Sequence, residues 1–183
     1  MKVITGTAKG IPLKTLDGND VRPTSQKVKE AVFSSIQFEI EGRSVLDLFA
    51  GSGQLGIEAL SRGAKKATFV DASNQSISIV KENLNKTRLM EKAVVLRCDF
   101  NTFLKTTTDT FDIVFIDPPY YEKLYDTALF GVANLLSDNG LIICEHPDTI
   151  TFEENIGRLS LQKIYKSGKI RFSIYRNSPE ITK

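Results

Sequence analysis

Short apolar runs alternate along the chain with longer segments in which apolar residues recur at every third or fourth position. A continuous apolar run of five or six residues is typical of a buried strand, whereas the wider spacing is typical of a helix that packs on one side. The runs predict strands at 45–49, 66–71, 93–97, 111–116 and 140–145. The wider spacing predicts helices from a Thr24 or Ser25 cap onward and at 55–60, 73–85 and 121–136. This alternation indicates an α/β fold with a mostly parallel sheet.

Both ends of the chain carry β-prone runs instead. Residues 1–5 and 11–16 are separated by a segment with two glycines, which predicts a hairpin ahead of the first helix. Near the other end, residues 159–165 and 170–176 predict a closing hairpin through Ser167-Gly168. We therefore expect a parallel core with a short β extension at its N-terminus.

The composition favours a single domain that spans residues 1–183. With 41% hydrophobic and 25% charged residues, the chain fits one globular core, and we expect 1–40 to extend a core at 41–183. No apolar run reaches the roughly 18 residues of a membrane span, and no signal-peptide pattern begins the chain, so we expect a cytoplasmic protein. One histidine and two cysteines, Cys98 and Cys144, favour reduced thiols over a disulfide or a metal site.

The segment at 45–58 reads as an apolar strand, a glycine-rich turn and the start of a helix. Ligands bind at such turns because glycines let the backbone approach closely and the helix N-terminus offers free N–H groups. The G-x-G-x-x-G spacing at 51–56, with Asp71 ending the next apolar run, also fits a dinucleotide site. Asp47 lies inside the strand, where a carboxylate would repel a pyrophosphate and attract an amino-acid ammonium. This favours S-adenosyl-L-methionine over a nicotinamide or flavin cofactor.

Three successive predicted strands carry a carboxylate at or near their carboxyl ends, namely Asp47, Asp71 and Asp99. Parallel strands end at one edge of the sheet, so these side chains are expected to line one cleft. Asp71 suits two ribose hydroxyls, because one carboxylate can accept from both. Asp99 suits the amino group of an adenine, and Phe100 can supply an apolar wall and a backbone N–H.

The fourth predicted strand ends in Asp117-Pro118-Pro119-Tyr120, the most specific pattern in the chain. The two prolines cannot continue a strand or helix, so the local carbonyls are expected to point outward. Asp117 and the Pro118 carbonyl can accept two hydrogen bonds from an exocyclic amino group. Tyr120 offers a flat face on which a base can stack. The pattern therefore indicates an enzyme that positions an amino group for attack on a methyl group.

Basic residues gather toward both ends of the chain. Lys and Arg outnumber Asp and Glu by six to four in 1–40 and by seven to three in 151–183, whereas the middle holds 11 against 15. Arg22 and Lys27 flank the predicted first helix, and the tail run interleaves Lys163, Lys166, Lys169, Arg171 and Arg176 with aromatic residues. This distribution favours a phosphate-facing rim around an acidic cofactor cleft.

Two motifs together resemble the amino-methylating branch of the S-adenosyl-L-methionine-dependent methyltransferases, namely Asp47-Leu48-Phe49-Ala50-Gly51-Ser52-Gly53 and Asp117-Pro118-Pro119-Tyr120. Further segments are similar to the RsmD family, which methylates N2 of a guanine in bacterial 16S ribosomal RNA: Thr5-Gly6, Lys9-Gly10, Arg22-Pro23-Thr24 with Glu30 and Phe33, and residues 56–64. The resemblance covers nearly the whole chain. It departs at Asp71, where the family often has glutamate, and at Gln26-Lys27, Ser34 and Cys98, where it often has Asp-Arg, asparagine and glycine.

The resemblance implies a Rossmann-like class I methyltransferase fold, with a seven-stranded sheet that has one antiparallel strand near its edge. It implies S-adenosyl-L-methionine as cofactor, 16S ribosomal RNA or the small ribosomal subunit as partner, and a monomer without metal or membrane. The implied cofactor-binding residues are Asp47, Phe49, Ala50, Gly51, Ser52, Gly53, Asp71, Asp99, Phe100 and Asp117. The implied catalytic residues are Asp117, Pro118, Pro119 and Tyr120, and the expected RNA contacts are Arg22, Thr24, Lys27, Lys166 and Lys169.

Two other functions fit the same motifs. One is an amino-methyltransferase that acts on adenine or cytosine in DNA, or on a protein glutamine, because the Asp-Pro-Pro-Tyr chemistry is shared among these enzymes. The other is a non-catalytic RNA-binding factor in ribosome assembly that has kept the fold. The intact cofactor and acceptor motifs favour an enzyme, and the absence of spare length for a target-recognition region favours RNA over DNA.

Overall fold

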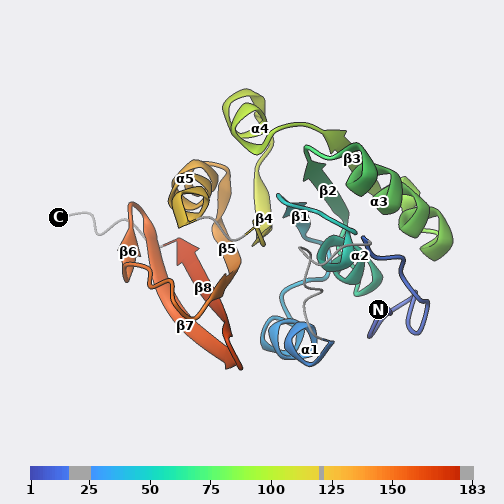
Figure 1. Cartoon of the computed structure of the whole chain (residues 1–183), viewed down its shortest axis with the longest axis horizontal. Helices are drawn as coiled ribbons and strands as arrows, with labels where there is room; N and C mark the ends of the chain where they lie inside the picture. The colour runs from blue at the N-terminus through green and yellow to red at the C-terminus, as the bar shows by residue number, and fades with distance from the viewer. Residues whose placement is uncertain (17–25, 120–121, 178–183) are drawn as a thin grey trace.

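The computed structural model of the chain describes residues 1–16, 26–119 and 122–177, and it has helices on both sides of a twisted sheet (Figure 1). The strands are β1 (Ser44–Asp47), β2 (Lys66–Asp71), β3 (Ala93–Arg97), β4 (Phe111–Ile116), β5 (Leu136–Pro147), β6 (Asn155–Ile156), β7 (Leu159–Ser167) and β8 (Ile170–Asn177). The helices are α1 (Gln26–Ser35), α2 (Gln54–Ser61), α3 (Asn74–Thr87), α4 (Phe100–Thr106) and α5 (Glu122–Ala133), with a short 3-10 turn η1 (Met90–Lys92).

The sheet confirms the predicted α/β class. Its strand order in the described part of the chain is β3-β2-β1-β4-β5-β8-β7-β6, and the first five strands pair in parallel. β8 is antiparallel to β5, β7 to β8, and β6 to β7. The predicted count of seven strands is one short, because β6 adds a two-residue pairing at the edge and runs, like β8, against the parallel strands. A pairing of this length leaves no recognisable pattern in the sequence.

Two hydrophobic clusters fill the two faces of the sheet. Along β4, Ile113 and Phe115 face the cluster that contains α1, α2 and α3, whereas Val114 and Ile116 face the cluster that contains α4 and α5. Because both faces are covered, the central strands read as continuous apolar runs rather than as alternating ones. This is why the predicted bounds of β2 and β4 match the structure; those of the edge strand β3 match as well.

The second half of the chain departs from the prediction in two places. A single helix was expected over 121–136, but α5 ends at Ala133 and β5 already begins at Leu136. Leu136 pairs with Phe111 of β4 before a register shift, so β5 is much longer than the expected 140–145. Helix α4 was not predicted. None of the helices in the described ranges is both long and apolar enough to cross a membrane.

The N-terminal residues form the predicted hairpin. Lys2 and Pro12 make an antiparallel bridge, and the Val3 amide donates to the Ile11 carbonyl at 3.0 Å. At the turn of the hairpin, Gly6 has φ +87°, and a Cβ added to it would lie 1.7 Å from the Ser61 carbonyl oxygen of α2. Only a glycine therefore fits where the hairpin meets this helix.

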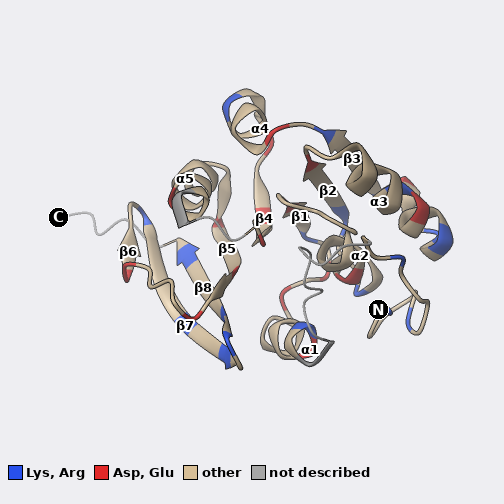
Figure 2. Ribbon diagram, viewed as in Figure 1, with Lys and Arg blue, Asp and Glu red and all other residues tan. Residues whose placement is uncertain are grey.

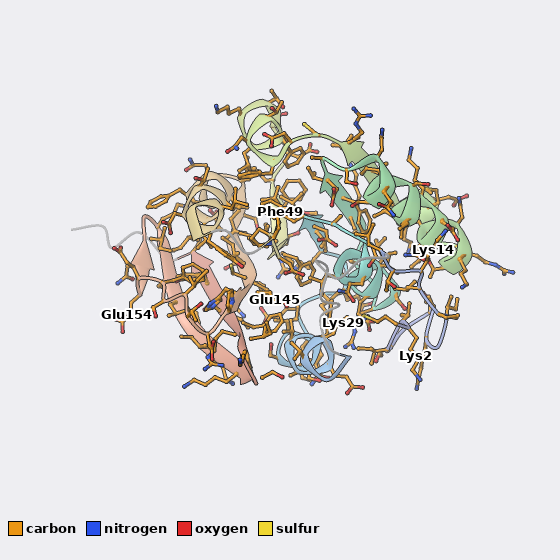
Figure 3. All side chains as sticks on the ribbon, viewed as in Figure 1. Lys2, Lys14, Lys29, Phe49, Glu145 and Glu154 are labelled. Carbon is orange, nitrogen blue, oxygen red and sulfur yellow. The ribbon has the colours of Figure 1, made fainter. Side chains whose placement is uncertain are left out.

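A buried ionic cluster holds the hairpin on α2. The Glu58 carboxylate has no exposed surface and accepts from the amides of Ile4 at 2.8 Å and Thr5 at 3.0 Å. It also pairs with Lys29 Nζ of α1 at 3.2 Å and Arg62 Nε at 2.8 Å. One side chain thus joins the hairpin, α1 and the helix that follows the glycine turn. Lys2 and Lys29 are labelled in Figure 3 on these neighbouring elements.

Candidate active site

A cavity of about 460 Å³ opens at the carboxyl ends of β1, β2 and β4. It lies where the strand order reverses between β1 and β4, which is the usual ligand position in open α/β sheets. Its volume is in the range of small-molecule sites. The residues that line it are Thr15, Leu16, Asp47, Leu48, Phe49, Ala50, Gly51, Ser52, Gln54, Leu55, Asp71, Ala72, Ser76, Cys98, Asp99, Phe100, Asp117, Pro118, Pro119 and Leu124.

The glycine turn between β1 and α2 forms one wall of the cavity. Gly51 and Gly53 have φ of 53° and 77°, which are conformations that favour glycine. Gly51 lines the cavity, as predicted. Gly53 does not line it, and its Cβ position is surrounded by Val80, Ile57 and Phe69. Gly53 therefore shapes the turn by close packing.

Asp47 lies at the end of β1 and is only 2% exposed. Its Oδ2 accepts from the Gly56 amide at 3.0 Å, so the carboxylate caps the first turn of α2 from the side. Burial raises the pKa of Asp47 to about 7, and the nearby Asp71 carboxylate adds to the rise, against the opposing effect of the Gly56 bond. A cationic ligand group in the cavity would stabilise the charged form of this side chain.

Asp71, at the end of β2, forms a hydrogen bond to the glycine turn between β1 and α2. Its Oδ2 accepts from the Gly51 amide at 2.9 Å and its Oδ1 from the Ser73 amide at 2.8 Å. Each carboxylate oxygen keeps a second lone pair for a ligand. The side chain thus orients the glycine turn as well as lining the cavity.

Asp99 and Phe100 begin helix α4 beside the cavity. Asp99 is the N-cap, because its Oδ1 accepts from the amides of Asn101 at 3.0 Å and Thr102 at 3.3 Å. The Phe100 ring lies 4.9 Å from that of Phe49, centroid to centroid, and the two form an apolar wall. Phe49 is labelled in Figure 3. Both predicted residues line the cavity, and Asp99 also caps the N-terminus of α4.

The end of β4 supplies the predicted acceptor motif. Asp117, Pro118 and Pro119 all line the cavity, together with the acids that end β1 and β2. Tyr120 lies outside the described residues. Four aspartates, Asp47, Asp71, Asp99 and Asp117, therefore line this cavity at one edge of the sheet.

The sequence reasoning missed several lining residues. Thr15 and Leu16 follow the N-terminal hairpin, and Gln54 begins α2. Gln54 Oε1 is buried and has no hydrogen-bond partner among the described residues, so the cavity contains an acceptor that a ligand N–H can satisfy. Its position directly after the glycine turn was the available signal. Thr15 and Leu16 carry no such signal, because only the folded hairpin brings them to the turn.

The predicted RNA contacts divide into two groups. Arg22 and Thr24 lie outside the described residues, and Lys27 is in α1 with an undescribed side chain. Lys166 and Lys169 are exposed at the tip of the β7–β8 hairpin. Pro147, at the end of β5, pairs with Ile170, so this tip lies at the same edge of the sheet as the cavity. Figure 2 shows the basic colour where β7 and β8 meet.

The strand order, with its reversal beside the cavity and the antiparallel β8, defines the class I S-adenosyl-L-methionine-dependent methyltransferase fold. The solved structure of the Escherichia coli protein yhhF agrees, with a TM-score of 0.88, 27% identity and 97% of each chain covered. The family described as Conserved hypothetical protein 95 matches residues 1–176. The chain belongs to this family, the RsmD family of ribosomal RNA methyltransferases, which confirms the resemblance drawn from its motifs.

Two curated relatives match almost the whole chain. The Bacillus subtilis protein YlbH is 38% identical over 181 residues, which are 96% of this chain and 98% of YlbH. The ribosomal RNA small subunit methyltransferase D of Haemophilus influenzae is 34% identical over 97% of this chain and 94% of its own length. The similarity therefore includes both the N-terminal extension and the closing hairpin.

Proposed function

We propose that this chain transfers a methyl group from S-adenosyl-L-methionine to the exocyclic N2 of a guanine in 16S ribosomal RNA. Membership of the RsmD family supports methylation of ribosomal RNA, and the Haemophilus influenzae relative is named for the small subunit. The observation that carries the proposal is that Asp117, Pro118 and Pro119 line the same cavity as Asp47 and the glycine turn. A donor site and an amine-acceptor site thereby share one space.

The cavity suits a cationic cofactor better than a phosphate-bearing one. Its polar walls near the glycine turn are rich in acceptors, with the carboxylates of Asp47 and Asp71 and the buried Gln54 oxygen. Carboxylates beside the glycine turn repel a pyrophosphate bound there and attract an ammonium or a sulfonium. When bound, S-adenosyl-L-methionine supplies an electrophilic methyl group on a sulfonium. The Phe49 and Phe100 rings offer the apolar wall for its adenine.

The end of β4 positions the target amine. Asp117 and the Pro118 carbonyl accept hydrogen bonds from its two N–H groups, which directs the nitrogen lone pair toward the methyl group. The lone pair of a guanine amino group is delocalised into the ring, so alignment matters more than a strong base. As the new N–C bond would form, the bond between the methyl carbon and sulfur would break, its electron pair going to sulfur to leave a neutral thioether. The amine would then carry the positive charge, which Asp117 stabilises until a proton leaves to water.

RNA binding is assigned to the basic rim. Lys166 and Lys169 lie at the cavity edge of the sheet, and the chain segment with Arg22, Thr24 and Lys27 follows directly after the cavity residues Thr15 and Leu16. A guanine that is exposed in a loop, or turned out of its stack, can enter the cavity while lysines hold the adjacent phosphates. The protein would act on 16S RNA or the small subunit in the cytoplasm.

The test is transfer of label from radiolabelled S-adenosyl-L-methionine to under-methylated small ribosomal subunits. Naked 16S RNA, duplex DNA and a glutamine-containing peptide are assayed alongside, and the product is identified after digestion. We expect N2-methylguanine in 16S RNA. Asp117→Ala should lower transfer by on the order of a hundredfold or more and leave cofactor affinity within a few fold. Asp126→Ala, which removes an exposed carboxylate from α5, is the matched control.

Each other result changes a defined part of the proposal. Label only in DNA or only in the peptide would retain the chemistry and overturn the substrate. Tight cofactor binding without label in any substrate would favour a non-catalytic assembly factor. An equal loss of cofactor binding and transfer in Asp117→Ala would make Asp117 a cofactor or structural residue.

A further inference from the structure

The segment that follows the N-terminal hairpin forms part of the cavity wall. Thr15 and Leu16 line the cavity, and Leu16 Cδ1 lies 4.0 Å from the Cβ position of Gly51 in the glycine turn. Residues 14–16 are therefore called the N-terminal wall. Neither β1 nor any other strand of the sheet pairs with this wall, so something else must fix its distance from the turn.

One buried side chain connects the N-terminal wall to the turn. Asn83 of α3 has no exposed surface. Its Oδ1 accepts from the Lys14 amide at 2.8 Å, and its Nδ2 donates to the Lys14 carbonyl at 2.9 Å. Its second Nδ2 hydrogen is directed to the Ser52 carbonyl, also at 2.9 Å. The side-chain amide thus pairs with Lys14 as a neighbouring strand would, and fastens the same point to the glycine turn.

The other attachment of the wall to α3 is weak by comparison. Lys14 Nζ lies 2.7 Å from Glu82 Oε2, but the two side chains are 53% and 54% exposed. Exposed ion pairs of this kind contribute little and are screened by salt. Lys14 is labelled in Figure 3 beside α3, with its side chain on the outer surface. The buried amide of Asn83 is therefore the stronger of these two contacts between the wall and α3.

We infer that Asn83 is a positioning residue for the cofactor. It holds the N-terminal wall and the glycine turn at a fixed separation, so that Thr15 and Leu16 meet a ligand bound against Gly51 and Ser52. This inference rests on the proposed cofactor. Without Asn83 the wall loses its two hydrogen bonds to α3 and its link to the Ser52 carbonyl. The ligand must then order the wall on binding, which weakens affinity but leaves the acceptor motif after β4 intact.

The test compares Asn83→Asp with Asn85→Asp. The first variant keeps the size of the side chain and removes both N–H donors, placing a carboxylate against two carbonyls. The second adds the same charge to an exposed position two residues along the same helix. Binding of S-adenosyl-L-methionine is measured by calorimetry. We expect Asn83→Asp to bind at least tenfold more weakly than wild type, and Asn85→Asp to bind within twofold of it.

Kinetics and hydrogen exchange separate positioning from general damage. Asn83→Asp should raise the KM for the cofactor, with kcat at saturation and the KM for the RNA within about threefold of wild type. Amide exchange should accelerate at residues 14–16 while the central strands stay protected. Leu16→Ala, which shortens the wall without altering α3, should weaken cofactor binding in the same direction and covers the case in which Asn83→Asp does not fold.

Three results would overturn the inference. The first is that Asn83→Asp and Asn85→Asp bind S-adenosyl-L-methionine with equal affinity. The second is that Asn83→Asp lowers kcat and the affinities for the cofactor and the RNA to the same extent. The third applies if Asn83→Asp does not fold, and is that Leu16→Ala binds the cofactor as wild type does. Failure of the proposed function is distinct. A wrong cofactor would show as no binding of S-adenosyl-L-methionine by the wild-type chain, and a wrong substrate as no label in 16S RNA while the difference between the two asparagine variants in cofactor binding persists.

Discussion

Asp47 combines two properties that oppose each other. Its burial at the end of β1 disfavours the charge and raises its pKa to about 7, yet the proposed ligand is cationic and needs that charge. In the free protein the Asp47 carboxyl is therefore partly protonated near pH 7, and a cation that binds beside it favours loss of that proton. Binding of the cofactor should therefore be coupled to ionisation of Asp47.

The coupling predicts a pH dependence of cofactor affinity. If the cation binds the ionised carboxylate, affinity should be constant above about pH 7 and fall by up to about tenfold per unit below it. Calorimetry between pH 5.5 and 8.5 would measure this, with Asp47→Asn as the control. The variant should bind weakly and show no such slope. A flat profile in the wild-type chain would contradict the assignment.

The same pKa predicts the direction of a stability change. The Asp47 pKa is 3.8 in the unfolded reference and about 7 in the fold, so between these values the folded state binds more protons and loses stability as the pH rises. Asp47→Asn keeps an acceptor for the Gly56 amide and should be more stable than the ligand-free wild type at pH 8, by up to about 4 kcal/mol. Urea unfolding would check this, and the gain should vanish near pH 4.

Asp71, Asp99 and Asn83 show which roles of single residues could be predicted from the sequence. The acids at the strand ends, Asp71 and Asp99, were correctly placed at the cavity, because parallel strands end at one edge. Their bonds to the glycine turn and to the start of α4 were not assigned, since a carboxylate that caps a helix and one that binds a ligand have the same sequence signature. The role inferred for Asn83 had no signal, because its partners are 31 and 69 residues away in the chain.

At the scale of elements, the attachment of the N-terminal hairpin depends on Glu58. Four groups point at its two oxygens, and two of them are backbone amides that the hairpin cannot satisfy otherwise. Burial lowers the pKa of the Lys29 ammonium, although its pairing with Glu58 opposes the shift. Desolvation therefore dominates, and Lys29 is the less favourable member of the cluster.

We predict unequal costs for removing the two charges. Glu58→Gln leaves the fully buried Lys29 without its counter-charge and should lower the free energy of unfolding by about 3 kcal/mol or more. Lys29→Met leaves Glu58 with Arg62 and two amides, and should cost about 1 kcal/mol or less. Urea unfolding of both variants measures the difference. Equal losses would show that Lys29 is needed for the cluster.

The bounds of a strand were most predictable where both of its faces are covered by helices. The strands β2 and β4 have the predicted bounds, because helices cover both faces and most of their residues are apolar. β3 also has the predicted bounds, although it is the edge strand and is partly exposed. The N-terminal part of β5 passes through Ser137-Asp138-Asn139-Gly140, which reads as a turn. β4 pairs with Leu136 before this segment and with Leu141 after it, so the segment is an irregularity within a longer strand. Helix α4 has seven residues and two buried phenylalanines, too few to show a helical period.

At the scale of the whole molecule, the basic tail is only partly available to RNA. Arg176 pairs with Glu39 at 2.7 Å and Arg171 with Asp148 at 3.7 Å, while the interleaved Phe172 and Tyr175 belong to the core. Lys166 and Lys169 form no ion pair within the described ranges and lie at the cavity edge. The uneven charge in the sequence pointed to this hairpin but could not separate its exposed lysines from its paired arginines.

Reversing the two hairpin lysines should weaken RNA binding without affecting the cofactor. We expect Lys166→Glu with Lys169→Glu to reduce affinity for 16S RNA by about tenfold or more at moderate salt, and to lower the salt slope by about one to two. Lys81→Glu with Lys86→Glu, on the exposed face of α3, is the control of equal charge. Filter binding at several salt concentrations measures both. Equal losses would indicate a general charge effect in place of a local contact.

The contact of Gly6 with α2 has a consequence for the evolution of the chain. Thr5-Gly6 is one of the segments that resemble the RsmD family, yet Gly6 lies against the Ser61 carbonyl and does not line the cavity. Selection at this position acts on shape, independently of the substrate. A descendant that changed its target nucleotide or lost catalysis would still need this glycine to keep the hairpin docked, so its persistence would mark shared ancestry and not shared activity.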